Sequence, residues 1–424
     1  MIYLEKLLDG VEVEWKPLGD ENIGKFIRGG GLQKKDFTEF GIGCIHYGQI
    51  YTYYGTYAFK TKSFVSEEFA KKARMAKQGD LVIATTSEND EDLCKAVAWL
   101  GDKEVAVSSD ACFYTHSLNP KYVAYFFQTE QFHKQKGPFI TGTKVRRVNA
   151  DNLAKIKIPI PCPENPKKSL KIQQKIVAIL DSFTELTAEL TAELTAELTA
   201  RKTQYSYYRE KLYSFDENKV KHLPLDDENI GVFQRGKRFV KTDLISEGIP
   251  TIHYGEMYTH YGTWADETIS FVSEKLVNDK NLRLAQKGDV VIVAAGETIE
   301  DIGKGTAWLG NDNVVIHDAC FSYKTSLNPK FVAYFTRTKQ FHDQIKKHIS
   351  SGKISAINAN GLGKAIIPVP SKEEQERIVT ILDKFDILTN SISEGLPKEI
   401  KLRKKQYQYY RDLLLAFPKD NLKV

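Results

Sequence analysis

The chain has 424 residues, of which 42% are apolar and 27% charged, a composition that is typical of globular proteins and excludes a disordered chain. The formal net charge of +5 permits a polyanionic partner without requiring one. No run of residues approaches the roughly 18 consecutive apolar residues of a membrane span, and the N-terminus lacks a signal-peptide pattern, so we expect a cytoplasmic protein of two or three domains without a membrane partner.

The first elements in chain order form a strand-rich segment, residues 18–161. Blocks such as IHYGQIYTYYGT (45–56) and EVAVSSDACFYT (104–115) alternate or run apolar between Gly, Asp and Lys breaks, which predicts strands. One helix is predicted over residues 118–135, because Asn119 can cap it and Pro120 suits its first turn. Strands with such a helix indicate an α+β domain.

A long helix is predicted next, from Ile172 to about Tyr213, where the sequence contains no Gly or Pro. Its apolar side chains recur with the helical period, and leucines continue this stripe through the TAEL repeats at 187–198. The stripe begins with Ile176, Ile179, Leu180, Phe183 and Leu186. Because a lone exposed helix of this length is marginal, we expect it to pair with another helix.

The same elements then recur. IHYGQIYTYYGTY (45–57) and IHYGEMYTHYGTW (252–264) share nine of thirteen residues, and the block at 117–126 returns at 326–335 with nine of ten identical. A second strand-rich segment, 225–370, is followed by a second helical segment, 371–417, which Gly395 and Pro397 interrupt. The chain is therefore an internal duplication.

The repeat is circular, because YLEKLL at the N-terminus resembles YREKLY (208–213), the end of the central helix. We therefore predict an α+β protein with two similar globular domains, separated by a long antiparallel two-helix coiled coil and related by a pseudo-two-fold axis. The predicted boundaries are an N-terminal segment 1–17 that completes the helical region, domains at 18–165 and 216–370, a central helix at 166–215 and a C-terminal helix at 371–424.

Catalytic motifs are absent from the sequence. It contains no phosphate-binding P-loop, no N-P-P-[FYW] motif of adenine methyltransferases and no glycine motif of a methyl-donor site. The five cysteines lack C-x-x-C spacing, which argues against disulfides and against a structural zinc site. We predict a recognition protein without a catalytic residue, metal or cofactor. The alternatives are a single-chain restriction enzyme or methyltransferase with an unrecognised active site, and a coiled-coil scaffold that does not bind DNA.

Basic clusters occur at matching places in the two halves, where glycine or other small residues let the backbone approach phosphates. The Tyr- and His-rich blocks add side chains that can hydrogen-bond bases or phosphates, although about half of these tyrosines are expected in the core. The candidate DNA-binding residues are Arg28, Lys34, Lys35, His46, Tyr47, Tyr51, Tyr54, Lys144, Arg146, Arg147, Arg235, Lys237, Arg238, His253, Tyr254, Tyr258, Tyr261 and Lys353.

The order of blocks resembles the specificity subunits of type I restriction–modification systems. Each half ends in IPIP or IPVP, then QxxIVxILDxF and RKxQYxYYRxxL, and the central helix carries the TAEL repeats. The resemblance covers essentially the whole chain. It implies a non-catalytic reader of double-stranded DNA, with one target-recognition domain per half-site and helices that set the gap between half-sites.

The resemblance also implies partners. Two methyltransferase subunits would dock on the helices, and ATP-dependent motor–nuclease subunits would join through them. S-adenosylmethionine, ATP and Mg²⁺ would bind those partners rather than this chain. The two recognition domains are unusually alike here, which suggests related half-sites in inverted orientation.

Overall fold

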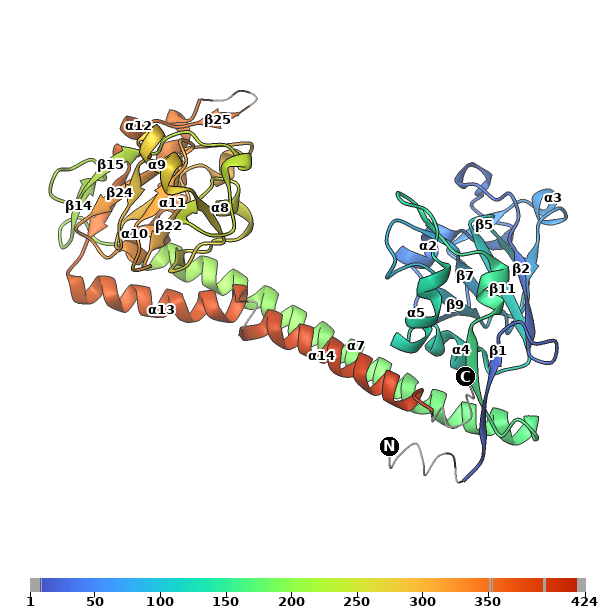
Figure 1. Ribbon diagram of the computed structural model, residues 1–424. Coiled ribbons are helices and arrows are strands. Elements are labelled where there is room, and N and C mark those ends of the chain that lie inside the picture. The colour runs from blue at the N-terminus through green and yellow to red at the C-terminus, as the bar shows by residue number, and fades with distance from the viewer. Residues whose placement is uncertain (1–7, 9, 351, 353, 392–393, 418–424) are drawn as a thin grey trace. The chain divides into compact units, whose positions relative to one another are not determined.

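The computed structural model describes residues 8, 10–350, 352, 354–391 and 394–417. The chain forms two compact units: unit 1 comprises residues 1–193 and 400–424, and unit 2 comprises residues 194–399 (Figure 1). Unit 1 is thus assembled from both ends of the chain. Of the predicted N-terminal segment 1–17, residues 1–7 and 9 lie outside the described residues, and with them most of the block YLEKLL that resembles the end of the central helix. Leu8 is buried in the core of unit 1.

Unit 1 contains two main sheets and two short ribbons. The five-stranded sheet has the order β2 (Gly24–Arg28), β11 (Ala111–His116), β7 (Leu81–Ala84), β9 (Ala96–Trp99) and β4 (Tyr57–Ala58). The four-stranded sheet has the order β5 (Ser63–Val65), β3 (Ile42–Ile45), β10 (Val105–Val107) and β6 (Met75–Ala76). The ribbons are β1 (Val13–Pro17) with β13 (Lys157–Pro161), and β8 (Thr86–Ser87) with β12 (Arg146–Arg147).

Unit 2 repeats this topology. Its five-stranded sheet has the order β15 (Gly231–Arg235), β24 (Cys320–Thr325), β20 (Val290–Val293), β22 (Gly305–Trp308) and β17 (Trp264–Ala265). Its four-stranded sheet has the order β18 (Ser270–Val272), β16 (Ile249–Ile252), β23 (Val314–Ile316) and β19 (Leu284–Ala285). The ribbons are β14 (Lys221–Pro224) with β26 (Ile366–Val369), and β21 (Ala295–Gly296) with β25 (Ser355–Ala356).

The central strands explain why the core lies on both faces of the larger sheet. All four residues of β7 are buried, with Leu81 and Ile83 in one apolar cluster and Val82 and Ala84 in another. This follows from the two-residue period of a strand, which sends alternate side chains to opposite faces.

Short helices cover the sheets. Unit 1 has α2 (Tyr47–Thr52), α3 (Glu67–Ala70), α4 (Pro120–Phe126), α5 (Glu130–Lys136) and α6 (Ala150–Ala154). Unit 2 has α8 (Glu256–Thr259), α9 (Glu274–Lys280), α10 (Pro329–Phe335), α11 (Lys339–Ile345) and α12 (Ala359–Gly363). Single 3₁₀ turns are η1 (Lys34–Asp36), η2 (Gly137–Phe139), η3 (Lys241–Asp243), η4 (Ile299–Asp301) and η5 (Lys346–His348).

The single helix predicted over residues 118–135 is two helices, α4 and α5. Asn119 caps α4 as expected, since its side chain accepts from the Lys121 and Tyr122 amides. The chain then restarts at Thr129, whose hydroxyl accepts from the Phe132 amide and caps α5. The prediction of one helix was wrong because a hydroxyl residue that can cap lies in the middle of an apolar periodic run.

Three long helices form the remaining layer: α7 (Pro166–Lys211), α13 (Lys372–Asn390) and α14 (Gly395–Leu414). The 46-residue α7 begins in unit 1 and ends in unit 2, and the predicted interruption separates α13 from α14. Gly395 has a φ of +73°, a left-handed conformation that glycine adopts without strain. No helix within these described ranges is long and apolar enough to cross a membrane.

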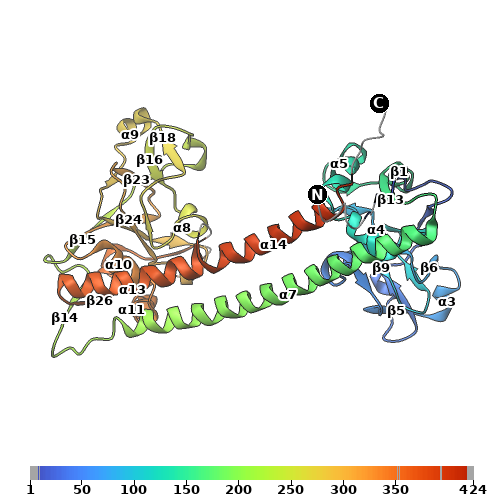
Figure 2. The ribbon, with the colours of Figure 1, turned by 90° about the horizontal axis from the view of Figure 1, so that it is seen from below.

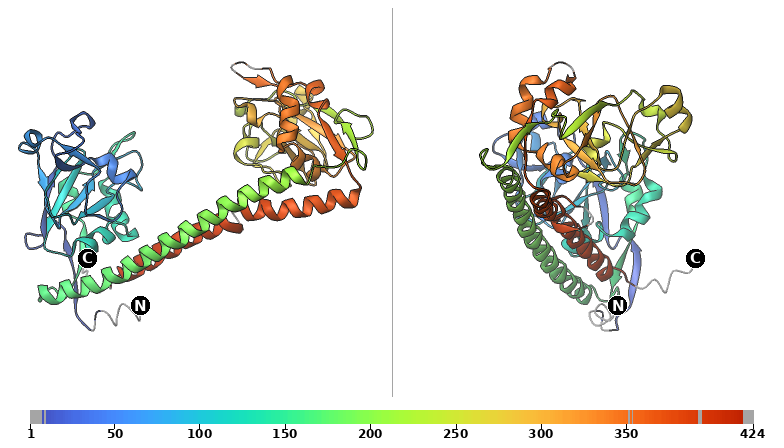
Figure 3. Two further views of the ribbon diagram at one scale, coloured as in Figure 1. Left: turned by 180° about the vertical axis from the view of Figure 1, so that it is seen from behind. Right: turned by 90° about the vertical axis from the view of Figure 1, so that its left-hand side faces the viewer.

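The predicted pairing of the helices is confirmed in each unit. In unit 1, the Thr184 and Tyr407 hydroxyls are 3.0 Å apart and the rings of Phe183 and Tyr410 pack at 5.7 Å, which joins α7 to the antiparallel α14 (Figures 2 and 3). In unit 2, the end of α7 packs on α13, where the Tyr205 and Tyr208 rings stack on Phe385.

The start of the predicted stripe faces the globular core rather than the partner helix alone. Ile176 and Leu180 belong to the main apolar cluster of unit 1, and Ile378 and Leu382 to that of unit 2. Leu186, predicted to continue the stripe, is 61% exposed. The helix therefore leaves the core one to two turns beyond Leu180.

A repeated polar cluster also joins each domain to its helix. The Asp181 carboxylate on α7 accepts from the Tyr125 hydroxyl at 2.7 Å and pairs with the Lys121 ammonium at 2.8 Å, both from α4. In unit 2, Asp383 on α13 holds Tyr334 and Lys330 in the same way. These contacts couple the orientation of each domain to that of its helix.

Candidate nucleic-acid interface

The Tyr- and His-rich block that was predicted as a strand forms a strand end followed by a helix. β3 ends at Ile45, His46 caps α2 by accepting from the Gly48 amide at 3.2 Å, and the Gln49 side chain accepts from the His46 amide. This reciprocal arrangement is a capping box, and it explains why helix replaces strand. In unit 2, His253 accepts from the Gly255 amide and Glu256 accepts from the His253 amide.

These histidines are neutral near pH 7. Burial, with a smaller contribution from the nearby Lys34 charge, lowers the pKa of His46 below its usual value. Burial and the neighbouring His317 lower the pKa of His253 to about 4. Both candidates can therefore act as hydrogen-bonding groups, but neither adds a positive charge for phosphates.

The tyrosines of the block divide between surface and core. Tyr47, the first residue of α2, and Tyr254, two residues before α8, are half-buried. Tyr51 and Tyr258, also half-buried, donate to the carbonyls of Thr86 and Ala295. Tyr54 and Tyr261 are buried, and their hydroxyls accept hydrogen bonds from backbone amides. These two side chains are therefore not available to reach DNA.

Arg28 lies exposed at the end of β2 and is held against the neighbouring strand. Its Nε donates to the Ser109 carbonyl at 3.3 Å, and the Arg74 side chain donates to the Arg28 carbonyl at 2.8 Å. Arg74 was not among the predicted residues, although the signal was present: RMAKQGD (74–80) and RLAQKGD (283–289) are repeated blocks.

Unit 2 has the same arginine pair. Arg235 Nε donates to the Asp318 carbonyl at 3.0 Å, and the Arg283 side chain donates to the Arg235 carbonyl at 3.2 Å. Each unit thus places two guanidinium groups at the same end of its larger sheet.

The glycine after each arginine is explained by packing. A Cβ on Gly29 would lie 2.0 Å from the Ser108 carbonyl oxygen, and one on Gly236 would lie 2.2 Å from that of His317. The glycine lets the loop cross the strand closely and hold the arginine in place.

The second basic cluster, Arg146 and Arg147, lies on a two-stranded ribbon that is joined to the turn beside Arg28. Arg146 and Arg147 of β12 lie opposite Ser87 and Thr86 of β8. The Thr86 hydroxyl donates to the Asp110 carboxylate at 3.4 Å, directly after Ser109, which holds Arg28. The fold therefore brings together two basic clusters that are more than a hundred residues apart in the sequence.

The two ribbon arginines differ in their partners. Arg146 pairs with Asp90 at 2.9 Å and donates to the Gly142 carbonyl at 2.6 Å. The Arg147 guanidinium is exposed and makes no hydrogen bond or ion pair within the described part of the chain.

The lysine candidates lie on the loops around these arginines. Lys34 and Lys35 are exposed on η1, and Lys144 is exposed in the turn before β12. In unit 2, Arg238 is exposed and Lys237 is half-buried, while Lys353 lies outside the described residues.

The four letters DACF occur at 110–113 and again at 318–321, but they do not occupy equivalent positions in the two units. Cys112 lies opposite Arg28 in unit 1, but Phe321 lies opposite the equivalent Arg235 in unit 2. Cys112 therefore corresponds to Phe321, and Asp110 to Ala319 rather than to Asp318. Matching the repeated letters therefore misplaces the equivalent residues by one position.

The arrangement suits polyanion binding. Within the described ranges, no three His, Cys, Asp or Glu side chains gather as metal ligands. What each unit presents is an exposed pair of arginines, surrounding lysines and neutral hydrogen-bonding side chains at one end of a rigid sheet. Such a surface can neutralise phosphates and read base edges.

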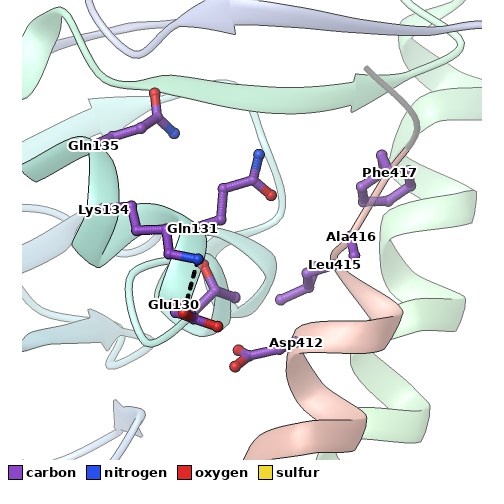
Figure 4. A pocket seen from close by; sticks show the side chains of 9 residues that line it. Glu130, Gln131, Lys134, Gln135, Asp412, Leu415, Ala416 and Phe417 are labelled. Carbon is purple, nitrogen blue, oxygen red and sulfur yellow. Dashed lines mark ion pairs between the residues drawn. The ribbon is translucent and has the colours of Figure 1, made fainter. Parts of the chain in front are cut away.

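A hollow of about 480 Å³ lies elsewhere in unit 1, between the start of α5 and the end of α14 (Figure 4). Asp412 faces it and bonds Arg411. Its repeat partner Glu210, one methylene longer, accepts from the amide that begins α11 at Lys339. The hollow therefore occupies the place where, in unit 2, a helix side chain bonds the start of α11.

Comparison with known proteins adds independent findings. The model of the type I restriction modification DNA specificity domain matches residues 20–200 and 228–402. The type I restriction enzyme EcoR124I/EcoR124II specificity subunit of Escherichia coli is 35% identical, covering 99% of this chain and 98% of the relative. A putative type I restriction enzyme specificity subunit of Haemophilus influenzae is 31% identical, covering 98% of each chain.

Solved structures share the fold. A chain from a study of complex assembly in a type I restriction–modification system superposes with a TM-score of 0.67 at 16% identity, covering 95% of this chain and 97% of that one. The HsdS subunit of Thermoanaerobacter tengcongensis gives 0.53 at 15% identity, covering 95% of each.

Proposed function

The chain belongs to the family of type I restriction–modification DNA specificity subunits, and on this premise we propose that it reads a bipartite DNA site, with unit 1 on one half-site and unit 2 on the other. As a specificity subunit, it supplies DNA recognition to a restriction–modification complex. The observation that carries the proposal is the repeated arginine pair, Arg28 with Arg74 and Arg235 with Arg283, at the same end of the larger sheet in both units. A coiled-coil scaffold has no need of such matched surfaces.

In this proposal the helices have two roles. α7 runs without interruption from one unit into the other, so its length governs the gap between the half-sites. The paired helices carry two methyltransferase subunits, and motor–nuclease subunits join through these. S-adenosylmethionine, ATP and Mg²⁺ bind the partner subunits, and this chain holds no cofactor and performs no chemical step.

The first test uses the purified chain alone and then with methyltransferase subunits. We expect no methyl transfer and no cleavage by the isolated chain, since its sequence lacks the donor-binding and P-loop motifs. The complete methyltransferase complex should methylate adenines within one bipartite motif. Methyl transfer by a preparation proven free of other subunits contradicts the proposal, as does a complete complex without sequence preference.

A second prediction concerns phosphate contacts. Replacing Arg28 and Arg74 by alanine should weaken binding to all DNA sequences, because counterion release accompanies each neutralised phosphate. Each true contact removed should flatten the slope of log K against log salt by about 0.9. Filter binding with random duplex DNA at salt concentrations between about 50 and 200 mM measures this slope.

The control is Lys134→Ala, a cation that pairs with Glu130 beside the end of α14 (Figure 4). This variant should leave the slope unchanged. An unchanged slope in the double arginine variant means that the pair is ordinary solvated surface.

A further inference from the structure

The two units share most of the candidate interface, so their differences are informative. Residues that are the same in both units, such as the arginine pair, cannot distinguish one half-site from the other. Any difference between the half-sites must be read where the units differ. The repeat within one chain therefore separates general DNA contacts from candidate readers of sequence.

One such difference lies in the two-stranded ribbon. Unit 1 has threonine, serine and two arginines there, whereas unit 2 has only small residues at the same pairing positions. In unit 1 these are Thr86, Ser87, Arg146 and Arg147; in unit 2 they are Ala295, Gly296, Ser355 and Ala356. Asp110, which accepts from the Thr86 hydroxyl of the ribbon, likewise corresponds to a small residue in unit 2, Ala319.

The loop that follows the first arginine of each pair, Arg28 or Arg235, differs in the opposite sense, because here unit 2 has the charged residues and unit 1 the small ones. Unit 1 has Gly30 and Gly31 after its arginine, and unit 2 has Lys237 and Arg238. Equivalent backbone bonds fix this correspondence, since the Gly30 amide donates to Val107 and the Lys237 amide to Ile316. The cations thus lie on the ribbon in unit 1 and on the loop in unit 2, on either side of the shared arginine pair.

Within the ribbon, Arg147 has the geometry of a reader. Residues directly opposite in an antiparallel pair project to the same face, so Arg147 shares its face with Thr86, whose hydroxyl bonds Asp110. Its guanidinium is exposed and has no partner within the described residues, whereas Arg146 is held by Asp90 and braces the ribbon.

We propose that the ribbon β8–β12 determines the half-site specificity of unit 1, with Arg147 as the base-reading residue and guanine as the base it favours. This rests on the proposed function. A free guanidinium on a rigid strand can donate two hydrogen bonds to the O6 and N7 of guanine. Ala356 at the equivalent position of unit 2 offers only a methyl group, which suits contact with thymine or no contact.

The experiment uses the full chain assembled with its methyltransferase subunits and a library of DNA duplexes with randomised half-sites. Methylated sites are sequenced for the wild type, for Arg147→Ala, which copies unit 2 into unit 1, and for Ala356→Arg, the reciprocal change. Lys144→Ala removes an exposed cation from the turn before the same ribbon and is the matched control.

Arg147→Ala should reduce the preference for guanine at one position of one half-site by about 10-fold and leave the other half-site unchanged. Ala356→Arg should create a guanine preference in the other half-site only. Lys144→Ala should lower methylation of all sites without changing the motif. If Arg147→Ala is too weak to methylate, sequencing of the library bound by the complex provides the same comparison.

The proposal is overturned if both motifs remain unchanged, or if Arg147→Ala weakens all sequences equally, as a phosphate contact would. A wild-type complex without a bipartite motif would instead refute the proposed function, and this outcome is read from a separate arm of the experiment.

Discussion

Replacing Leu180 by aspartate is expected to unfold the junction between α7 and the core of unit 1. The Leu180 side chain is fully buried among apolar residues. A carboxylate there loses its hydration without gaining a partner, and the apolar contacts of leucine are lost as well. The free energy of unfolding should fall by about 5 kcal/mol. Leu382→Asp should do the same in unit 2, where the equivalent side chain is buried in the core.

The control lies on the same helix. Leu186 belongs to the same sequence stripe but is 61% exposed, so Leu186→Asp should change stability by less than about 1 kcal/mol. Urea denaturation followed by circular dichroism measures all three variants. Equal melting of Leu180→Asp and Leu186→Asp would show that the stripe does not pack as described.

The second large effect is expected from deleting one TAEL unit, Thr191–Leu194. These residues lie within the uninterrupted α7, and the border between the two units falls inside them. The deletion shortens the helix by about 6 Å and rotates its far part by about 40°. One DNA base pair advances about 3.4 Å and turns about 34–36°. We expect the gap between half-sites to change by about one base pair while both half-sites keep their bases.

The rotation produced by the deletion matches that of one base pair better than the change in length does. We expect the rotation to determine the new gap, because a domain turned away from its groove loses its base contacts. Replacing the same four residues by alanines keeps the length of the helix, since alanine is a good helix former, and should leave the gap unchanged. Adenine methylation mapped across the genome of cells carrying each variant measures the gap. The same gap in an active deletion variant, or altered half-site bases, would contradict a ruler.

Much of the architecture could be predicted because its signals are local or repeated. The spacing of Ile176 and Leu180 predicts a helix, and the similar blocks at 45–57 and 252–264 predict two similar domains. Asn119 and Pro120 mark the start of a helix, because the asparagine side chain can cap it and proline suits its first turn. The candidate arginines, Arg28 and Arg235 among them, stay predictions, and they rest on the same kind of signal, since each occurs in a matching basic block.

Only the tertiary structure determines which residues and strands lie opposite each other. Arg74 meets Arg28, and β12 meets β8, through pairing between strands that are far apart in the sequence, and no local pattern encodes such pairing. The DACF blocks show the physical reason most clearly. The four letters are displaced by one residue against Arg28 or Arg235, and because side chains alternate between the faces of a strand, each letter then lies on the opposite face. Cys112 therefore packs in the cluster beside the helices, whereas Cys320, the same letter of the same block, packs on the opposite face of its sheet.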